Sequence, residues 1–257
     1  MTTIAERLAG AVSEGRLTTV YQPQVAIETG QIVSMEALCR WTDAVLGPVP
    51  ADRFIPVAEE TGLIVAVGRQ MFRQVLHDLP SLLRVWSDLR VGINFSVREL
   101  SEPDFPTWIA QTLSQQRSPM GRHLEIEVTE TIFQQDTQAV SERLETLRRM
   151  GFSIAIDDFG TGQSSLSRLH TLPFDKIKLD RQFVLGLEKP MVVEIVRAVA
   201  GLTRRMGLAL VVEGVETETQ RAALQALGCP YFQGYLAYRP APLEAWLSMK
   251  DVPQATG

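Results

Sequence analysis

Polar residues end most of the strand-like runs in this 257-residue sequence. In chain order they are Glu36, Asn94, Glu127, Asp157, Asp158, Lys178 and Glu213, and five of the seven are carboxylates. A single acid at a strand end is usually a solvated edge or a helix cap. If the strands close a barrel, however, their ends converge on one mouth, where carboxylates repel one another unless cations neutralise them. The pattern therefore predicts a metal site.

The ligand types indicate which metal this site would hold. All the candidate ligands are oxygens, with one Asn and no paired Cys or His, which favours Mg²⁺ or Mn²⁺ over zinc. The adjacent pair Asp157 and Asp158 suits two ions, because one carboxylate can bridge both while its neighbour binds one. Two ions of this kind are the usual apparatus of phosphodiester hydrolysis.

Two of these motifs each leave two interpretations open. The segment from Asp157 to Gly162 is either a glycine-rich turn with an Asp cap or a mobile loop, hinged at two glycines, that carries a ligand. Lys178 shares one strand face with Lys176 and Asp180. It is either an ordinary exposed lysine or a group that holds an attacking water or a phosphate oxygen.

A glycosidase would also use paired carboxylates in a barrel. A glycan site would normally show aromatic platforms near the strand ends. Of the four tryptophans, only Trp41 lies near one, so this alternative is less favoured.

The hydrophobic periodicity predicts the elements that position these residues. Ile4, Leu8 and Val12 recur every four residues, which predicts a helix within residues 1–16 that leads into the first strand. Strands are expected at 18–27, 32–41, 91–95, 124–128, 153–156, 176–179, 208–212 and 231–232. Helices are expected at 54–79, 108–113, 139–150, 192–206 and 216–227, with a loop at 47–50.

This α/β alternation predicts a TIM-type (β/α)8 barrel formed by a single domain over residues 1–257, with a flexible tail at 250–257. An open doubly wound sheet is the competitor, because sequence rhythm cannot show whether a sheet closes.

Composition and charge limit the protein class, the kinds of partner and the cellular location that fit this sequence. Hydrophobic residues make up 45% and charged residues 21%, as in globular proteins. The 25 basic and 30 acidic residues give a net charge of −5, which argues against a nucleic-acid polymer as partner. Two cysteines, Cys39 and Cys229, are too few for a disulfide framework. No apolar stretch reaches the roughly 20 residues of a spanning helix, and no signal peptide is visible, so we expect a cytoplasmic protein without membrane insertion.

Taken together, the motifs resemble the EAL domain family of cyclic di-GMP phosphodiesterases. The resemblance runs from Tyr21-Gln22-Pro23 to Gln233-Gly234-Tyr235. Between them stand Glu36-Ala37-Leu38 with Arg40-Trp41, Phe54-Ile55-Pro56, Glu59-Glu60-Thr61-Gly62, Asn94-Phe95-Ser96, Glu127-Val128-Thr129-Glu130, Asp157-Asp158-Phe159-Gly160-Thr161-Gly162, Lys178-Leu179-Asp180 and Glu213-Gly214-Val215-Glu216-Thr217.

The resemblance implies a barrel with an antiparallel first strand, and hydrolysis of cyclic di-GMP to linear 5′-pGpG with two Mg²⁺ or Mn²⁺ ions. It assigns Glu36, Asn94, Glu127 and Asp157 to the first ion, and Asp157, Asp158 and Glu213 to the second. Lys178 would orient the attacking water, and Glu213 is either a ligand, a general base or both. Arg40 would clamp a phosphate, Gln22 and Leu38 would line a guanine-side pocket, Gln233 would lie near the site, and Glu216 would tether the glycine-rich loop.

The resemblance also implies a homodimer through the segment after Asp158, from Phe159 to Leu169. Gln163 stands there in place of the family's usual Tyr, which predicts a weaker dimer. A second departure is one residue missing near 185–190. Because no acidic position is lost, an active enzyme is favoured over an inactive EAL receptor that binds cyclic di-GMP or a protein partner.

Overall fold

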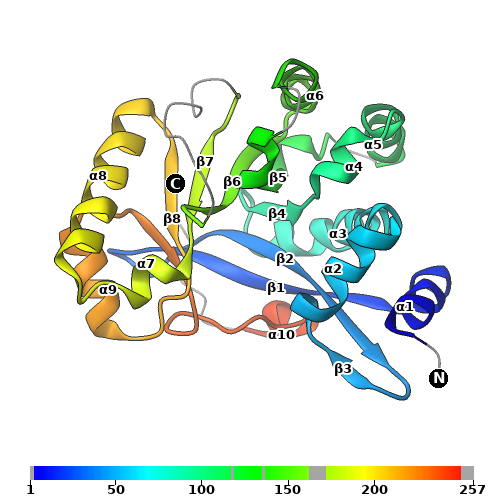
Figure 1. Ribbon diagram of the computed structural model, residues 1–257, viewed down its shortest axis with the longest axis horizontal. Coiled ribbons are helices and arrows are strands. Elements are labelled where there is room, and N and C mark those ends of the chain that lie inside the picture. The colour runs from blue at the N-terminus through cyan, green and yellow to red at the C-terminus, as the bar shows by residue number, and fades with distance from the viewer. Residues whose placement is uncertain (1–2, 117–118, 135–136, 162–171, 250–257) are drawn as a thin grey trace.

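A closed β-barrel forms the centre of the molecule (Figure 1). The computed structural model describes residues 3–116, 119–134, 137–161 and 172–249. The barrel strands are β1 (Leu17–Ala26), β2 (Ile32–Asp43), β4 (Arg90–Asn94), β5 (Leu124–Thr129), β6 (Ser153–Phe159), β7 (Lys176–Leu179), β8 (Ala209–Val212) and β9 (Tyr231–Gln233). The ring closes because β1 pairs with both β2 and β9. The predicted TIM-type barrel is therefore confirmed, and the open sheet is excluded.

The first strand runs against its neighbours, as the resemblance implied. β1 is antiparallel to β2 and β9, whereas the other barrel strands are parallel to one another. β1 and β2 are joined by a short turn that contains Gly30 with φ +70°. A connection this short can join only antiparallel strands. The carboxyl ends of the seven parallel strands consequently meet at one end of the barrel, here called the mouth.

Helices cover the outside of the barrel (Figure 1). They include α3 (Ile64–Val85), α5 (Phe105–Ser114), α6 (Thr137–Arg149), α8 (Pro190–Met206) and α9 (Glu218–Ala226). Shorter elements are α4 (Val97–Ser101), α7 (Arg181–Leu185), α10 (Leu243–Ser248) and the 3₁₀ turns η1 (Gly121–His123) and η2 (Glu130–Gln134). In α3 the buried Val67, Met71, Val75, Leu79 and Leu82 recur at helical spacing, which seats one face on the barrel. None of the described helices is long and apolar enough to cross a membrane.

Two predicted segments differ from the structure. The expected loop at 47–50 contains a short strand, β3 (Gly47–Val49), which folds back on the end of β2 through a turn where Gly47 has φ +69°. The expected single helix at 54–79 is two helices, α2 (Ala51–Thr61) and α3, because Gly62 with φ +80° ends the first in a left-handed cap.

The amino-terminal helix is confirmed. α1 (Ile4–Ser13) begins with a capping box in which Thr3 and Glu6 bond each other's backbone. It packs with Trp41, which is 1% exposed and meets Phe54 edge-on. Because Trp41 is buried in this core, it is not a platform for a sugar ring.

Candidate active site at the barrel mouth

Lys178 lies at the centre of the mouth, at the end of β7. Its side chain is 0% exposed. Its Nζ lies 2.8 Å from Glu127 Oε2, 2.9 Å from Glu213 Oε1, 3.1 Å from Asp157 Oδ2 and 3.2 Å from Glu36 Oε2. Burial alone would lower the pKa of Lys178, but these four carboxylates raise it well above its ordinary value. The interpretation of Lys178 as an exposed lysine is therefore excluded.

The carboxylates around Lys178 form two overlapping groups of oxygen ligands. Oxygens of Glu36, Glu127 and Asp157 lie within 4.8 Å of one another, as do those of Asp157, Asp158 and Glu213. Asp157 belongs to both groups, which is the geometry of a bridging ligand. Four carboxylates thus contact a single ammonium group and Asp158 adds a fifth to the cluster, and this excess of negative charge attracts cations.

The pKa shifts show how strongly the acids resist ionising together. Burial, then the charge of Asp157, raises the pKa of Asp158 to about 6. Burial raises the pKa of Glu213 to about 8 despite the opposing charge of Lys178. It also raises the pKa of Glu127 well above its ordinary value. Without cations, part of this cluster therefore holds protons near neutral pH.

Glu36 behaves differently from the other buried acids. Burial raises its pKa, but Lys178 and hydrogen bonds from Gln233 and Asn94 outweigh burial, so its pKa is lowered. Asn94 Nδ2 donates to Glu36 Oε1 at 2.8 Å, and Gln233 Nε2 donates to Glu36 Oε2 at 2.7 Å. Glu36 is consequently held ionised and oriented.

The donor set fits a hard divalent cation. Glu127 Oε1 is buried and has no hydrogen-bond partner among the described residues, while Oε2 bonds Lys178. A buried acceptor without a donor is costly, and a cation would satisfy it. Gly92 on β4 makes room for this carboxylate, because a Cβ there would overlap Glu127 Oε1.

A bulge in β6 aims both aspartates at the mouth. Successive strand residues normally point to opposite faces, but the register of β6 shifts between Ile156 and Phe159, and Asp158 has φ +53°. Asp158 is the one described non-glycine residue with a positive φ. Such strain is tolerated where the surroundings enforce it, and it collects at functional sites.

The described start of the glycine-rich segment is a turn. Thr161 Oγ1 donates to Asp158 O at 2.9 Å. Gly160 is held by Glu130 Oε2 at 3.1 Å and by Gln182 Nε2 at 2.9 Å. Residues 162–171 lie outside the described part of the chain, so the predicted mobility of the loop stays a prediction.

The candidate substrate contacts lie in two cavities that share Leu38. The mouth cavity, of about 430 Å³, is lined by four acids of the cluster together with Gln22, Leu38, Glu216 and Gln233; the four acids are Glu36, Asp157, Asp158 and Glu213. Arg40 lines the neighbouring cavity, of about 340 Å³, which is mainly apolar. The backbone N–H of Glu216 donates a hydrogen bond to Gln220 Oε1, at 2.8 Å. Its predicted tether to the loop therefore remains a prediction.

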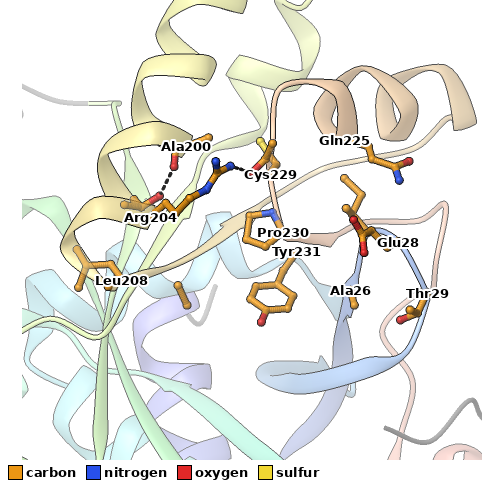
Figure 2. A pocket seen from close by; sticks show the side chains of 15 residues that line it. Ala26, Glu28, Thr29, Ala200, Arg204, Leu208, Gln225, Cys229, Pro230 and Tyr231 are labelled. Atoms are coloured by element: carbon orange, nitrogen blue, oxygen red, sulfur yellow. Dashed lines mark hydrogen bonds between the residues drawn. The ribbon is translucent and has the colours of Figure 1, made fainter. Parts of the chain in front are cut away.

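A larger cavity, of about 670 Å³, opens at the other end of the barrel (Figure 2). Ala26, Ala209 and Tyr231 line it at strand ends remote from the mouth. Its charged lining residues are Glu28 and Arg204, and Arg204 Nη2 already donates to Gly228 O at 3.1 Å. This cavity lacks an acidic cluster among its lining residues, so the mouth is the candidate active site.

Comparison with known proteins identifies the family. A family model of the EAL domain matches residues 5–240. The chain belongs to the EAL domain family.

Relatives of this EAL domain include enzymes. It is 35% identical over 237 residues to the cyclic di-GMP phosphodiesterase RocR of Pseudomonas aeruginosa, covering 92% of this chain and 60% of RocR. It is 40% identical over 253 residues to an uncharacterized signaling protein of Caulobacter vibrioides, covering 96% of this chain and 31% of that protein. The solved PaMucR phosphodiesterase, in complex with c-di-GMP, is 35% identical with a TM-score of 0.88, covering 95% of this chain and 99% of that one.

The name-giving motif of the EAL family follows the alternation of β2. Glu36 faces Lys178 and Leu38 lines both cavities, while Ala37 lies 3% exposed in the hydrophobic core. All seven strand-end residues predicted from the sequence meet at the mouth of this EAL domain, and their individual roles remain predictions.

Sequence reasoning placed Lys176 on the strand face of Lys178 but missed the second polar layer to which it belongs, one step deeper in the barrel. This layer includes three buried residues, each two positions from a residue of the mouth on the same strand: Gln24 after Gln22, Glu125 before Glu127, and Lys176 before Lys178. The period of two along a strand could have found them, because it places them on the same inner face.

The raised pKa values predict a pH-dependent response to Mg²⁺. The folded cation-free domain holds more protons than the unfolded chain from about pH 4.5 up to the folded pKa of about 8 at Glu213, so its stability falls as pH rises through this window. Mg²⁺ would replace those protons. We expect a larger Mg²⁺-induced rise in melting temperature at pH 8.5 than at pH 6, and a weaker pH dependence in Glu213→Gln. Equal rises at both pH values would contradict the protonated cluster.

Proposed function

We propose that this EAL domain hydrolyses cyclic di-GMP to linear 5′-pGpG with two Mg²⁺ or Mn²⁺ ions. The observation that carries the proposal is the pair of overlapping oxygen clusters that share Asp157 around the buried Lys178. The names of RocR and PaMucR, which are more than 30% identical to this chain, support the substrate class. We further propose that residues 1–257 are a single domain, and that it works in the cytoplasm, which its two free cysteines support.

In this proposal the acids divide between two ions. Glu36, Asn94, Glu127 and Asp157 would hold one, and Asp157, Asp158 and Glu213 would hold the other. Bound at the mouth, the ions would neutralise the carboxylates, activate a water and stabilise the departing oxygen.

Two side chains would handle the attacking water. Lys178 stays protonated because its pKa is raised, so it can donate a hydrogen bond to the water or to a phosphate oxygen. Glu213, with a pKa of about 8 in the cation-free site, is suited to accept the water's proton. Ion binding at Glu213 would lower that pKa and keep the carboxylate ionised at neutral pH, which a ligand and a base both require, so we propose both roles for it.

The two cavities suit a substrate with two guanosine halves. Gln22 and Leu38 would line one base in the mouth cavity, and the second half would extend past Leu38 into the apolar cavity, where Arg40 can reach a phosphate. Gln233 would remain near the site as the partner of Glu36, and Glu216 would tether the loop.

The alternative is a receptor that binds cyclic di-GMP without cleaving it. All acidic positions are present and gathered at the mouth, so the arrangement favours the enzyme.

Purified protein should convert cyclic di-GMP to 5′-pGpG with Mg²⁺ or Mn²⁺ and lose activity in EDTA. Ca²⁺ should not support turnover, because its ligand distances of about 2.3–2.6 Å exceed the roughly 2.0–2.1 Å of Mg²⁺. Chromatography of the products tests both statements. Binding of cyclic di-GMP without any product in Mg²⁺ or Mn²⁺ would assign the chain to the receptor class.

Asp157→Asn and Lys178→Met should each lower kcat by about 10²-fold or more, because each removes an oriented charged group from the reacting centre. Initial rates at saturating Mn²⁺ provide the measurement. Arg84→Met, which changes an exposed cation in the last turn of α3, is the matched control and should keep the wild-type rate. A Lys178→Met enzyme with the wild-type rate would remove Lys178 from the mechanism.

We also propose a homodimer that involves the segment after Asp158. Residues 162–171, including Gln163, lie outside the described residues, so the support comes from the neighbouring α7 and α8. There Leu185 is 63% exposed and Met191 is 72% exposed, and apolar side chains this exposed are suited to contact a second copy.

Gln163→Tyr should strengthen this dimer and raise specific activity with it, because a tyrosine restores aromatic area at the interface. Sedimentation velocity and initial rates over the same protein concentrations test the coupling. A tight wild-type dimer with flat specific activity would contradict it.

A further inference from the structure

A buried ion pair lies directly beneath the acidic mouth, inside the barrel. Lys176 Nζ lies 2.6 Å from Glu125 Oε1, 3.0 Å from Gln24 Oε1 and 3.5 Å from Ser34 Oγ. Glu125 Oε2 accepts a further bond from Ser153 Oγ at 3.1 Å. All five residues are at most 8% exposed. In contrast to the mouth, one ammonium here faces one carboxylate, so this layer is neutral without any cation.

Lys176 determines which way the Gln24 amide points. An ammonium group has only donors, so the Gln24 atom that faces it must be the acceptor Oε1. Ser34 Oγ also donates to that oxygen, at 2.6 Å. The Gln24 Nε2 group is therefore turned away from Lys176 and donates to Gln233 Oε1 at 3.0 Å.

The orientation of Gln24 fixes that of Gln233 in turn. Because Gln233 Oε1 accepts from Gln24, its Nε2 group must face the mouth. There it donates to Glu36 Oε2 at 2.7 Å and to Gln22 Oε1 at 3.2 Å. With the opposite orientation, an amide oxygen would face the Glu36 carboxylate at the same distance and repel it.

We propose that Lys176 is a positioning residue for Glu36, acting through Gln24 and Gln233. Lys176 touches neither substrate nor reacting atoms; it ensures that a donor, rather than an acceptor, orients the carboxylate of Glu36. The inference rests on the proposed function, in which Glu36 holds a metal ion. It gives the Lys176–Glu125 pair a role beyond stability, since hydrogen-bond partners of metal ligands tune metal affinity.

Two variants cut this hydrogen-bond chain at different links. Lys176→Met combined with Glu125→Gln removes both charges together, so that no buried charge is left unpaired. Gln24→Met removes the middle link and leaves the ion pair intact. Ser153→Ala is the matched control, because Ser153 is buried in the same layer but bonds Glu125 away from the path to Glu36.

The measurement is Mn²⁺ binding by isothermal titration calorimetry without substrate, together with the Mn²⁺ dependence of hydrolysis. We expect both cut variants to bind Mn²⁺ about 10-fold more weakly. Their activation curves should shift to higher Mn²⁺ while the plateau rate stays near that of the wild type. Ser153→Ala should bind within about twofold of the wild type.

Thermal melting identifies variants that fail to fold. If the Lys176→Met/Glu125→Gln double variant fails to fold, Gln24→Met alone tests the proposal. Wild-type Mn²⁺ affinity in a folded Gln24→Met protein would overturn the positioning role. Equal weakening in Ser153→Ala would also overturn it, because the effect would then be general loosening of the layer. A wild type that neither binds Mn²⁺ nor cleaves cyclic di-GMP would instead remove the proposed function.

Discussion

A cluster of five carboxylates, four of them in contact with one buried ammonium, is the constraint on which the mouth of this barrel depends. Two unit charges 4 Å apart interact by about 4 kcal/mol at an effective dielectric constant of about 20, so one lysine cannot offset five acids. Three features accommodate the remaining negative charge. Hydrogen-bond donors orient Glu36, a glycine makes space for Glu127, and Glu213 retains a proton. A site arranged in this way is incomplete as protein alone.

The two polar layers of the barrel differ in the balance of their charges. The lower layer pairs Lys176 with Glu125 and satisfies both with neighbouring side chains. The upper layer leaves Glu127 Oε1 without a donor among the described residues. A balanced, saturated layer supports rigidity, whereas an unbalanced layer favours ligand binding. The same alternation along the same strands produces both layers, and the residue types decide which layer is left with an excess of negative charge.

Much of this arrangement could be predicted from residue types and spacing. The strand ends marked by Glu36, Glu127 and Glu213 do converge, because the parallel strands have one common direction. Asp158 could not be placed in this way, since its orientation depends on a bulge and a left-handed backbone that alternation does not contain. Gly62 was similarly missed as a helix end, because a glycine within an amphipathic pattern is also compatible with one continuous helix.

The hydrogen-bond chain below the mouth shows a different limit of prediction. Gln24 and Gln233 are far apart in sequence and become neighbours only when β1 closes the ring against β9. The family resemblance predicted the direction of β1. The alternation of hydrophobic residues could not, because it is the same for parallel and antiparallel strands.

The reversed first strand also decides where the chain enters the barrel. Leu17, the first residue of β1, pairs with Trp41 near the carboxyl end of β2, so α1 lies on the mouth side (Figure 1). With a parallel first strand, the chain would enter at the opposite end. Because β1 is reversed, polypeptide joined ahead of α1 would be attached on the mouth side of the barrel, and β1 reaches Gln22 five residues after Leu17. The strand that enters there carries Gln22, which pairs with Glu36 of β2, so the entry of the chain and the acidic cluster share one hairpin.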